Sequence, residues 1–106
     1  MKAEMLEAEF SGRRVPYHGH LLRLKGSDAI ALIERAAEEG VPVLGVNCLI
    51  LSDDGTREPI DQIADYSAAV REGHGCWEPA EAHVASRMSG DYVFEILLGD
   101  DPIQVV

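Results

Sequence analysis

The hydrophobic residues between positions 28 and 39 repeat with the period of a helix. They are Ala29, Ile30, Leu32, Ile33, Ala36 and Ala37. This spacing forms one apolar stripe along a helix, with Glu34, Arg35, Glu38 and Glu39 on the side that faces water. We expect Ser27 or Asp28 to accept hydrogen bonds from the first free amides, and Gly40 to close the helix in the left-handed conformation.

Two later segments have the pattern of strands. Val43–Leu51 is apolar on both faces, which is typical of a strand in the middle of a sheet. Asp91–Leu98 alternates, and its apolar residues share one face. These residues are Tyr92, Phe94, Ile96 and Leu98. An imperfect alternation over His20–Lys25 predicts a third strand, which Gly26 ends.

The remaining segments have weaker patterns. Glu7–Phe10 and Val15–Tyr17 are predicted to form a loose hairpin at a sheet edge, because Pro16 cannot donate to a ladder. Ser52–Thr56 has the composition of a tight turn. Pro59–Val70 is either a short helix or an irregular acidic loop, with helix slightly favoured. Glu78–Pro79 begins a further helix that we expect to reach about Ser89.

Together these elements predict one α+β domain over residues 1–106, with a small sheet of about four strands and two to three helices packed on it. The hydrophobic share of 46% is ordinary for a globular chain. The residues expected in the core are Ile30, Ile33, Leu44, Val46, Phe94 and Ile96.

Charge narrows the range of partners. Acidic residues outnumber basic ones by 19 to 9, which gives a formal net charge of −10 at pH 7. From Ser52 to the end, twelve acids stand against three bases, so nearly all the excess lies in the carboxyl-terminal half. DNA and anionic membranes repel such a chain, because binding to them depends on Lys and Arg. We therefore expect a cationic protein partner, no nucleic acid and no membrane.

The apolar runs, the amino terminus and the cysteines indicate in which cellular compartment the protein lies. The longest apolar run, Val41–Leu51, is much shorter than the roughly 20 residues of a membrane span. Met1–Glu7 mixes acids with small and apolar residues and lacks the pattern of an export signal. Cys48 lies in an apolar run and Cys76 beside a tryptophan, settings in which a reduced cysteine acts as a small hydrophobe. We expect a cytoplasmic protein.

Metal binding has little support in the pattern. His18 and His20 would share one face of a strand, and His74 or His83 could complete a zinc site. However, no Cys-x-x-Cys or His-Glu-x-x-His spacing surrounds them, so we expect surface or loop histidines and no metal or other cofactor.

Catalysis has little support either. No Gly-x-Ser-x-Gly elbow surrounds Ser67, and only spatial pairing with His74 or His83 would activate the Cys76 thiol. Nucleotide-binding glycine motifs are absent from the sequence. The sequence therefore predicts a protein that is not an enzyme.

A stretch of acids followed by two aromatic residues is the best candidate for a docking surface. Its members are Asp53, Asp54, Glu58, Asp61, Asp65, Tyr66 and Trp77. The acids do not follow the spacing of a calcium loop. Clustered carboxylates raise association rates with a basic partner, and aromatic residues beside charge are favoured as interface anchors. The alternatives are a solvated acidic face and a tryptophan buried in the core.

Several short motifs resemble a known family. They are the helix Asp28–Glu39 followed by Val43-Leu44-Gly45-Val46, then Pro59-Ile60, Asp65-Tyr66-Ser67, Trp77 with Ala80 and Glu81, and Arg87 before Tyr92–Ile96. In these motifs the chain resembles, over about residues 28–98, the small immunity proteins of bacterial polymorphic toxin systems. Asn47 stands where the pattern has an acidic residue.

The resemblance implies a cytoplasmic protein that neutralises a cognate toxin by stoichiometric binding, without catalytic residues. The toxin domain would be basic, since many toxins that cleave nucleic acid carry a basic substrate-binding surface. Two other classes stay open. One is a structural or regulatory domain that self-associates or senses a small molecule, and the other is a small enzyme.

Overall fold

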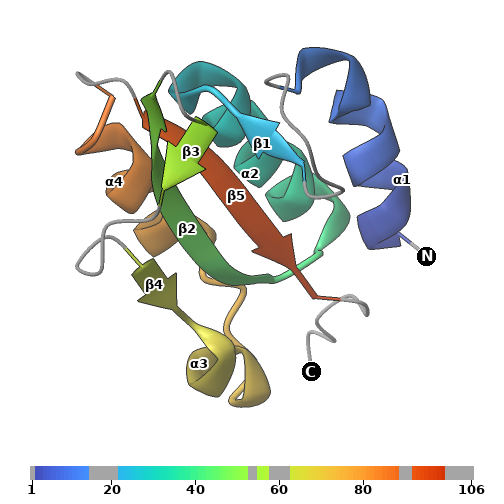
Figure 1. Cartoon of the computed structure of the whole chain (residues 1–106). Helices are drawn as coiled ribbons and strands as arrows, with labels where there is room; N and C mark the ends of the chain where they lie inside the picture. Colours follow the sequence, from blue (N-terminus) through green and yellow to red (C-terminus); the bar gives the residue numbers. More distant parts are fainter. Residues whose placement is uncertain (1, 15–21, 53–54, 58–62, 89–91, 100–106) are drawn as a thin grey trace.

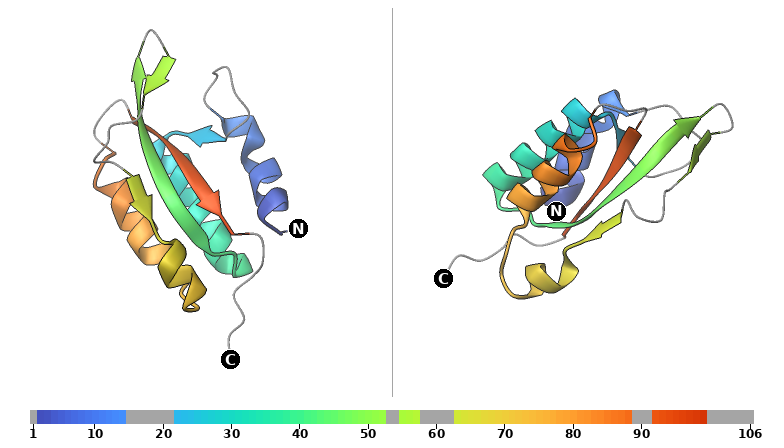
Figure 2. Two further views of the ribbon diagram at one scale, coloured as in Figure 1. Left: turned by 60° about the horizontal axis from the view of Figure 1, so that its bottom comes forward. Right: turned by 90° about the vertical axis from the view of Figure 1, so that its left-hand side faces the viewer.

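Helices cover one face of an antiparallel sheet in the computed structural model, which describes residues 2–14, 22–52, 55–57, 63–88 and 92–99 (Figures 1 and 2). The described helices are α1 (Lys2–Phe10), α2 (Gly26–Glu39), α3 (Ser67–Arg71) and α4 (Trp77–Ala85), with a 3-10 turn at Ser11–Arg13. The described strands are β1 (Arg23–Leu24), β2 (Val43–Ser52), β3 (Gly55–Arg57), β4 (Ile63–Asp65) and β5 (Tyr92–Leu98). The predicted α+β class is confirmed.

The long strands β2 and β5 form the centre of the sheet. The strand order is β1-β5-β2-β3, and β4 also pairs with β2. All these pairings are antiparallel. In the β2–β5 ladder Val46 lies opposite Ile96 and Cys48 opposite Phe94. The interior position predicted for Val43–Leu51 is therefore confirmed.

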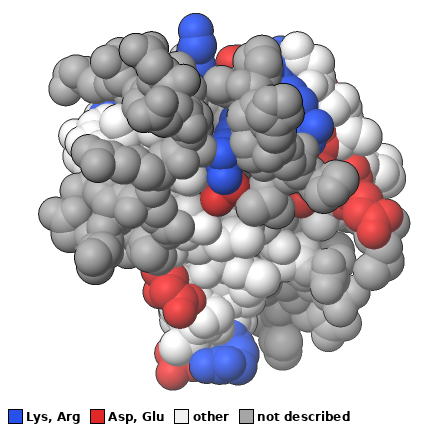
Figure 3. Space-filling view, in the orientation of Figure 1, with Lys and Arg blue, Asp and Glu red and all other residues white. Residues whose placement is uncertain are grey.

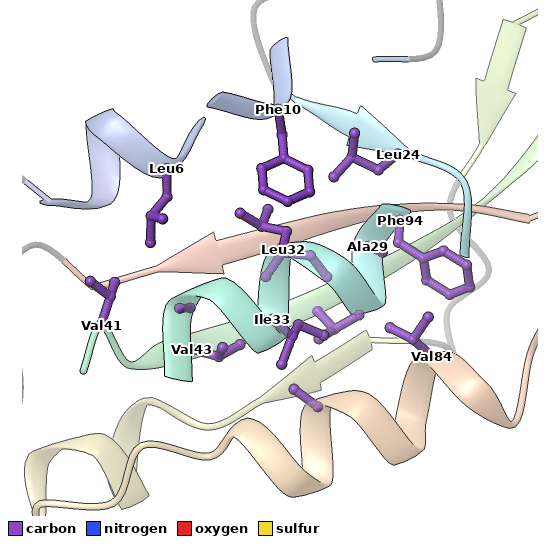
Figure 4. Close-up of a cluster of buried hydrophobic side chains, with 14 of the residues drawn as sticks. Leu6, Phe10, Leu24, Ala29, Leu32, Ile33, Val41, Val43, Val84 and Phe94 are labelled. Atoms are coloured by element: carbon purple, nitrogen blue, oxygen red, sulfur yellow. The ribbon is translucent and has the colours of Figure 1, made fainter. Parts of the chain in front are cut away.

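The core lies between this sheet and the helices (Figure 4). Ile33 of α2 and Phe94 of β5 are 0% and 1% exposed, and the face of β5 that was predicted to be apolar is the one that packs on the helices. Val46 and Ile96 are also buried. Ile30 is half-buried against this cluster. The prediction for Leu44 is wrong: it is half-buried outside the cluster, because the ladder between β2 and β5 is irregular between Val43 and Gly45.

Helix α2 ends as predicted but begins differently. Gly40 has a φ of 73° and its amide donates to the carbonyl of Ala37 at 3.2 Å, which is the left-handed closure expected of glycine. The N-cap is Lys25, with no capping side chain, so neither Ser27 nor Asp28 caps the helix. The Asp28 carboxylate instead accepts from the Arg13 guanidinium at 3.4 Å.

The amino-terminal hairpin prediction is wrong for its described residues, because residues 2–10 form helix α1. Ala3, Leu6 and Phe10 are buried in the main core, and their spacing of three and four residues is helical. Helix α1 packs on α2, so the apolar surface of α2 decides the structure of this segment. Val15–Tyr17 lies outside the described residues.

The segment predicted as a helix over Pro59–Val70 contains a strand and a shorter helix. Ile63 to Asp65 pair with β2, where Ala64 lies opposite Val46, and α3 begins only at Ser67. Pairing with β2 overrides the helical pattern here. The second helix also differs from the prediction, since α4 ends at Ala85. Met88, expected on its apolar side, is exposed.

The state of the two cysteines and the length of the apolar helices can be read from the described residues. Cys48 and Cys76 are both buried and both free. No helix within the described ranges is long and apolar enough to cross a membrane.

Candidate functional site

Three of the seven residues predicted to form a docking surface lie in the described part of the chain, and the fold brings them to one end of β2. The amide of Tyr66 donates to the carbonyl of Leu44 at 2.8 Å, and the amide of Val43 donates to the carbonyl of Gly75 at 2.9 Å. The segments that carry Tyr66 and Trp77 are thus attached to adjacent residues of one strand. The other four lie outside the described residues: Asp53, Asp54, Glu58 and Asp61.

Asp65 is exposed and has a local structural role at the start of α3. One of its carboxylate oxygens accepts from the Ser67 hydroxyl at 2.6 Å and from the Ser67 amide at 2.9 Å. These hydrogen bonds, with a smaller contribution from the charge of Arg71, hold the pKa of Asp65 below its ordinary value. The carboxylate therefore stays charged on the surface over the whole neutral range.

Tyr66 is half-buried and packs against the main core. Burial, and to a lesser degree the nearby Cys76 thiol, raises the pKa of its phenol. Much of its ring therefore packs in the fold, and only the remaining part is open to a partner.

Trp77 is half-buried and held in a fixed orientation. Its indole Nε1–H donates to the carbonyl of Val41 at 2.7 Å. Its six-membered ring lies directly against Gly75, where a Cβ atom would overlap with the ring carbons. Only glycine fits at that position, so the sequence Gly75-Cys76-Trp77 sets the direction of the indole ring.

A hollow opens beside this tryptophan, between α3 and the start of α4, with a volume of about 440 Å³. It is lined by Ala69, His74, Gly75, Cys76, Trp77, Glu78 and Pro79. Of these lining residues, the sequence pattern predicted only Trp77 as part of a docking surface. Gly75 and Pro79 each lie two residues from Trp77. A flexible glycine and a rigid proline so close together favour an irregular surface, and this was the feature of the sequence that could have indicated the hollow.

One exposed acid directly after α3 and one in the first turn of α4 form no ion pair within the described residues. Arg35 pairs with Glu9 at 2.9 Å and with Glu38 at 2.8 Å, where α1 packs on α2. Within the described ranges, by contrast, neither Glu72 nor Glu78 forms an ion pair, and both are exposed. Their charges are therefore available to a cationic partner.

The sheet face opposite the helices holds a polar cluster that sequence reasoning missed. Glu95 is 6% exposed. It accepts from the Arg23 guanidinium at 3.0 Å and from the Asn47 side-chain amide at 3.3 Å. The cluster crosses three strands, with Arg23 opposite Glu95 and Glu95 opposite Asn47. An amide at position 47 supplies a donor to Glu95, whereas the acid of the resembled pattern would repel it.

This sheet face is uncharged over much of its visible middle, with acidic side chains at its lower left (Figure 3). Leu97 contributes an exposed apolar side chain there, at 42% exposure. Leu49 and Val93 form a separate buried pair on the same face. The face is therefore apolar around one buried ion pair.

The two side chains that were weighed as nucleophiles, Ser67 and Cys76, form hydrogen bonds within their own segments. The Ser67 hydroxyl donates to Asp65, and the Cys76 thiol donates to the carbonyl of His74 at 3.8 Å. Burial raises the pKa of both the Cys48 and Cys76 thiols, which favours the less reactive thiol form. Within the described ranges, no three His, Cys, Asp or Glu residues are placed to hold a metal ion.

Comparison with known proteins found no family model and no curated protein sequence that matches the chain.

Proposed function

We propose that this chain is a cytoplasmic binding protein that neutralises a basic protein partner, such as a bacterial toxin domain, by forming a stoichiometric complex with it. The observation that carries the proposal is the charge distribution. The net charge is −10, nearly all of it after Leu51. The exposed Glu78 lines the same hollow as Trp77, whose indole is held by the carbonyl of Val41. Charge of one sign at a surface speeds encounter with the opposite sign and fixes orientation.

The resemblance to immunity proteins agrees with this chemistry. Its motifs include Trp77 with Ala80 and Glu81, and Asp65-Tyr66-Ser67. These two motifs lie at the same end of β2, since Tyr66 and Gly75 bond to adjacent residues of that strand. An inhibitor that acts by covering a basic surface needs no catalytic groups, and the local engagement of Ser67 and Cys76 is consistent with such a role.

The proposal is tested first by asking whether a gene beside that of this chain encodes a secreted protein with a basic carboxyl-terminal domain, and then by mixing that domain with this chain. The two proteins are expected to form a stable complex on size-exclusion chromatography, and the toxin domain is expected to lose its activity in proportion to the amount of this chain added. Association should slow as salt rises, because screening weakens charge steering.

A charge-reversed variant tests which acidic surface speeds association with the partner. Asp61→Lys with Asp65→Lys should slow association and reduce its salt dependence. Its melting temperature should fall slightly, because Asp65→Lys also removes the acceptor of the two hydrogen bonds from Ser67. The matched control is Glu4→Lys with Glu7→Lys, which reverses two exposed acids on α1, on the opposite side of the molecule from α4 (Figure 1). Equal association rates for both double variants, at low and at high salt, would contradict this surface. The exposed basic residues Arg13, Arg14 and Lys25 would then be the next surface to test.

A further inference from the structure

We propose that the hollow between α3 and α4 receives an arginine or lysine side chain of the partner protein, held over the ring of Trp77 and beside the carboxylate of Glu78. This inference rests on the proposed function, because it assigns the contact through which a basic partner would be anchored. Three observations support it: a fixed aromatic wall, an unpaired carboxylate, and a volume and lining suited to a long aliphatic stem.

The aromatic wall is fixed before any partner arrives. The hydrogen bond from the Trp77 indole to Val41 and the contact of its ring with Gly75 orient the indole. Tryptophan is the best aromatic partner for a cation, because the face of its ring attracts positive charge. A ring that does not have to reorient loses little entropy on binding, so more of that attraction contributes to affinity.

The charge at the hollow favours a cation despite the start of α4. A helix amino terminus carries the equivalent of roughly half a positive charge, which alone would favour an anion. Glu78 lies in the first turn of α4 and carries a full negative charge. This one carboxylate therefore outweighs the partial charge of the helix end.

The size and lining fit a long side chain. A volume of about 440 Å³ lies within the range of roughly 300–1,000 Å³ that is usual for ligand pockets. Ala69 and Pro79 give apolar walls, against which the methylene stem of Arg or Lys packs while its charged head stays near the rim. A negatively charged side chain would instead be repelled by Glu78.

The test uses two acetylated and amidated peptides, Gly-Arg-Gly-Arg-Gly and the same peptide with citrulline in place of arginine. Citrulline keeps the shape of arginine and lacks its charge. The chain contains a single tryptophan, so its fluorescence reports directly on the hollow. A saturable fluorescence change with the arginine peptide, absent with the citrulline peptide, is the expected result. No saturable change, or an equal change with both peptides, would overturn the inference.

Two variants show whether the hollow itself binds the peptide. Glu78→Gln keeps the shape of the side chain and should weaken peptide binding by about threefold to fivefold. Its control, Glu34→Gln, removes the same charge from the exposed side of α2 and should have a smaller effect. Ala69→Leu fills the hollow without changing charge and should abolish the fluorescence change. Equal affinities for the Glu78 and Glu34 variants, both folded by circular dichroism, would contradict the assignment.

The same variants separate this inference from the proposed function. If the basic toxin domain forms the complex and Glu78→Gln and Ala69→Leu leave its dissociation rate unchanged, the hollow is not the anchor and the proposed function stands. If the arginine peptide binds but the toxin domain forms no complex, the proposed function fails, and a partner protein as the source of the cation fails with it. Faster dissociation in both hollow variants would support both.

Discussion

At the scale of single residues, Trp77 shows how one side chain can serve both the fold and a surface. Its indole nitrogen bonds to Val41 in the interior while its ring forms one wall of an open hollow. Gly75 makes this possible, because any larger residue would occupy the space of the ring. The surface that we propose for binding therefore depends on a glycine that need not touch the partner.

Replacing Gly75 with alanine should destabilise the protein by about 1–3 kcal/mol, because the indole ring has to move away from its hydrogen bond with Val41. Urea unfolding followed by circular dichroism measures this cost. The control is Gly12→Ala, where an added Cβ meets nothing within 4 Å and a change within about 0.5 kcal/mol is expected. Equal unfolding midpoints for the two variants would contradict the packing described for Trp77.

Asp65 offers a titration test of the turn before α3. Because hydrogen bonds from Ser67 lower the pKa of Asp65, its charged form stabilises the fold above the ordinary pKa of the carboxyl, and that contribution is lost as the pH falls through the lowered value. Ser67→Ala removes the hydroxyl donor and should raise the pKa of Asp65 toward its ordinary value. The carboxyl carbon shift of Asp65, followed by NMR between pH 2 and 7, measures the change.

The control for this titration is Ser86→Ala. That hydroxyl donates to the carbonyl of His83 at 2.9 Å and has no contact with Asp65, so the titration of Asp65 should stay as in the parent protein. An unchanged titration in Ser67→Ala as well would show that the short hydrogen bond is not formed in solution.

At the scale of the elements, the packing of α2 on β5 forms the centre of the core. Ile33 and Phe94 point into the same interior from these two elements (Figure 4). Their positions follow from simple periods, since Ile33 lies in the 3.6-residue stripe of α2 and Phe94 in the alternating face of β5. Where a period is regular, the sequence predicts both the element and its buried face.

Ile33→Ala and Phe94→Ala should each cost about 2–5 kcal/mol of unfolding free energy, because each leaves a cavity in a close-packed interior. Chemical denaturation measures both costs. Glu34→Ala is the matched control on α2, since its side chain is exposed. Melting temperatures that match the control in both core variants would contradict the arrangement of α2 on β5.

At the scale of the whole molecule, the net charge of −10 acts against compactness. Some acids are offset locally, as where Arg35 binds Glu9, Glu38 and Glu39, and the hydrogen bond to Arg35 lowers the pKa of Glu9. Such exposed pairs are each worth little. Acids outnumber bases by 19 to 9 over the whole chain, so we expect repulsion among carboxylates to be the larger effect.

The melting temperature should therefore rise when sodium chloride is increased from about 0.01 M to about 0.15 M, since the screening length falls from about 30 Å to about 8 Å. Differential scanning calorimetry at fixed pH measures it. A melting temperature that falls with salt would show that the ion pairs of Arg35 outweigh the repulsion. Sucrose at matched osmolality serves as the uncharged control.

The sequence by itself determined those parts of the protein in which one regular period runs for many residues. Helix α2 with its closing Gly40, the interior strand β2 and the apolar face of β5 could all be predicted, because burial of a regular stripe or face leaves one favourable structure. The tertiary structure alone decided the short segments. Residues 2–10 became helical against α2, and residues 63–65 became a strand against β2.

The candidate site, too, was predicted from the sequence in some parts and decided by the tertiary structure in others. Composition predicted an acidic, aromatic docking surface. Of its residues, Asp65 and Trp77 lie in segments that bond to adjacent residues of β2, through Tyr66 and Gly75. Sequence did not predict the hollow, because it depends on how Gly75 admits the indole ring and on where α3 lies beside α4. It also missed the ion pair of Arg23 with Glu95, because residues 72 positions apart meet only through strand pairing. Contacts between distant segments depend on register, and register is a property of the folded sheet.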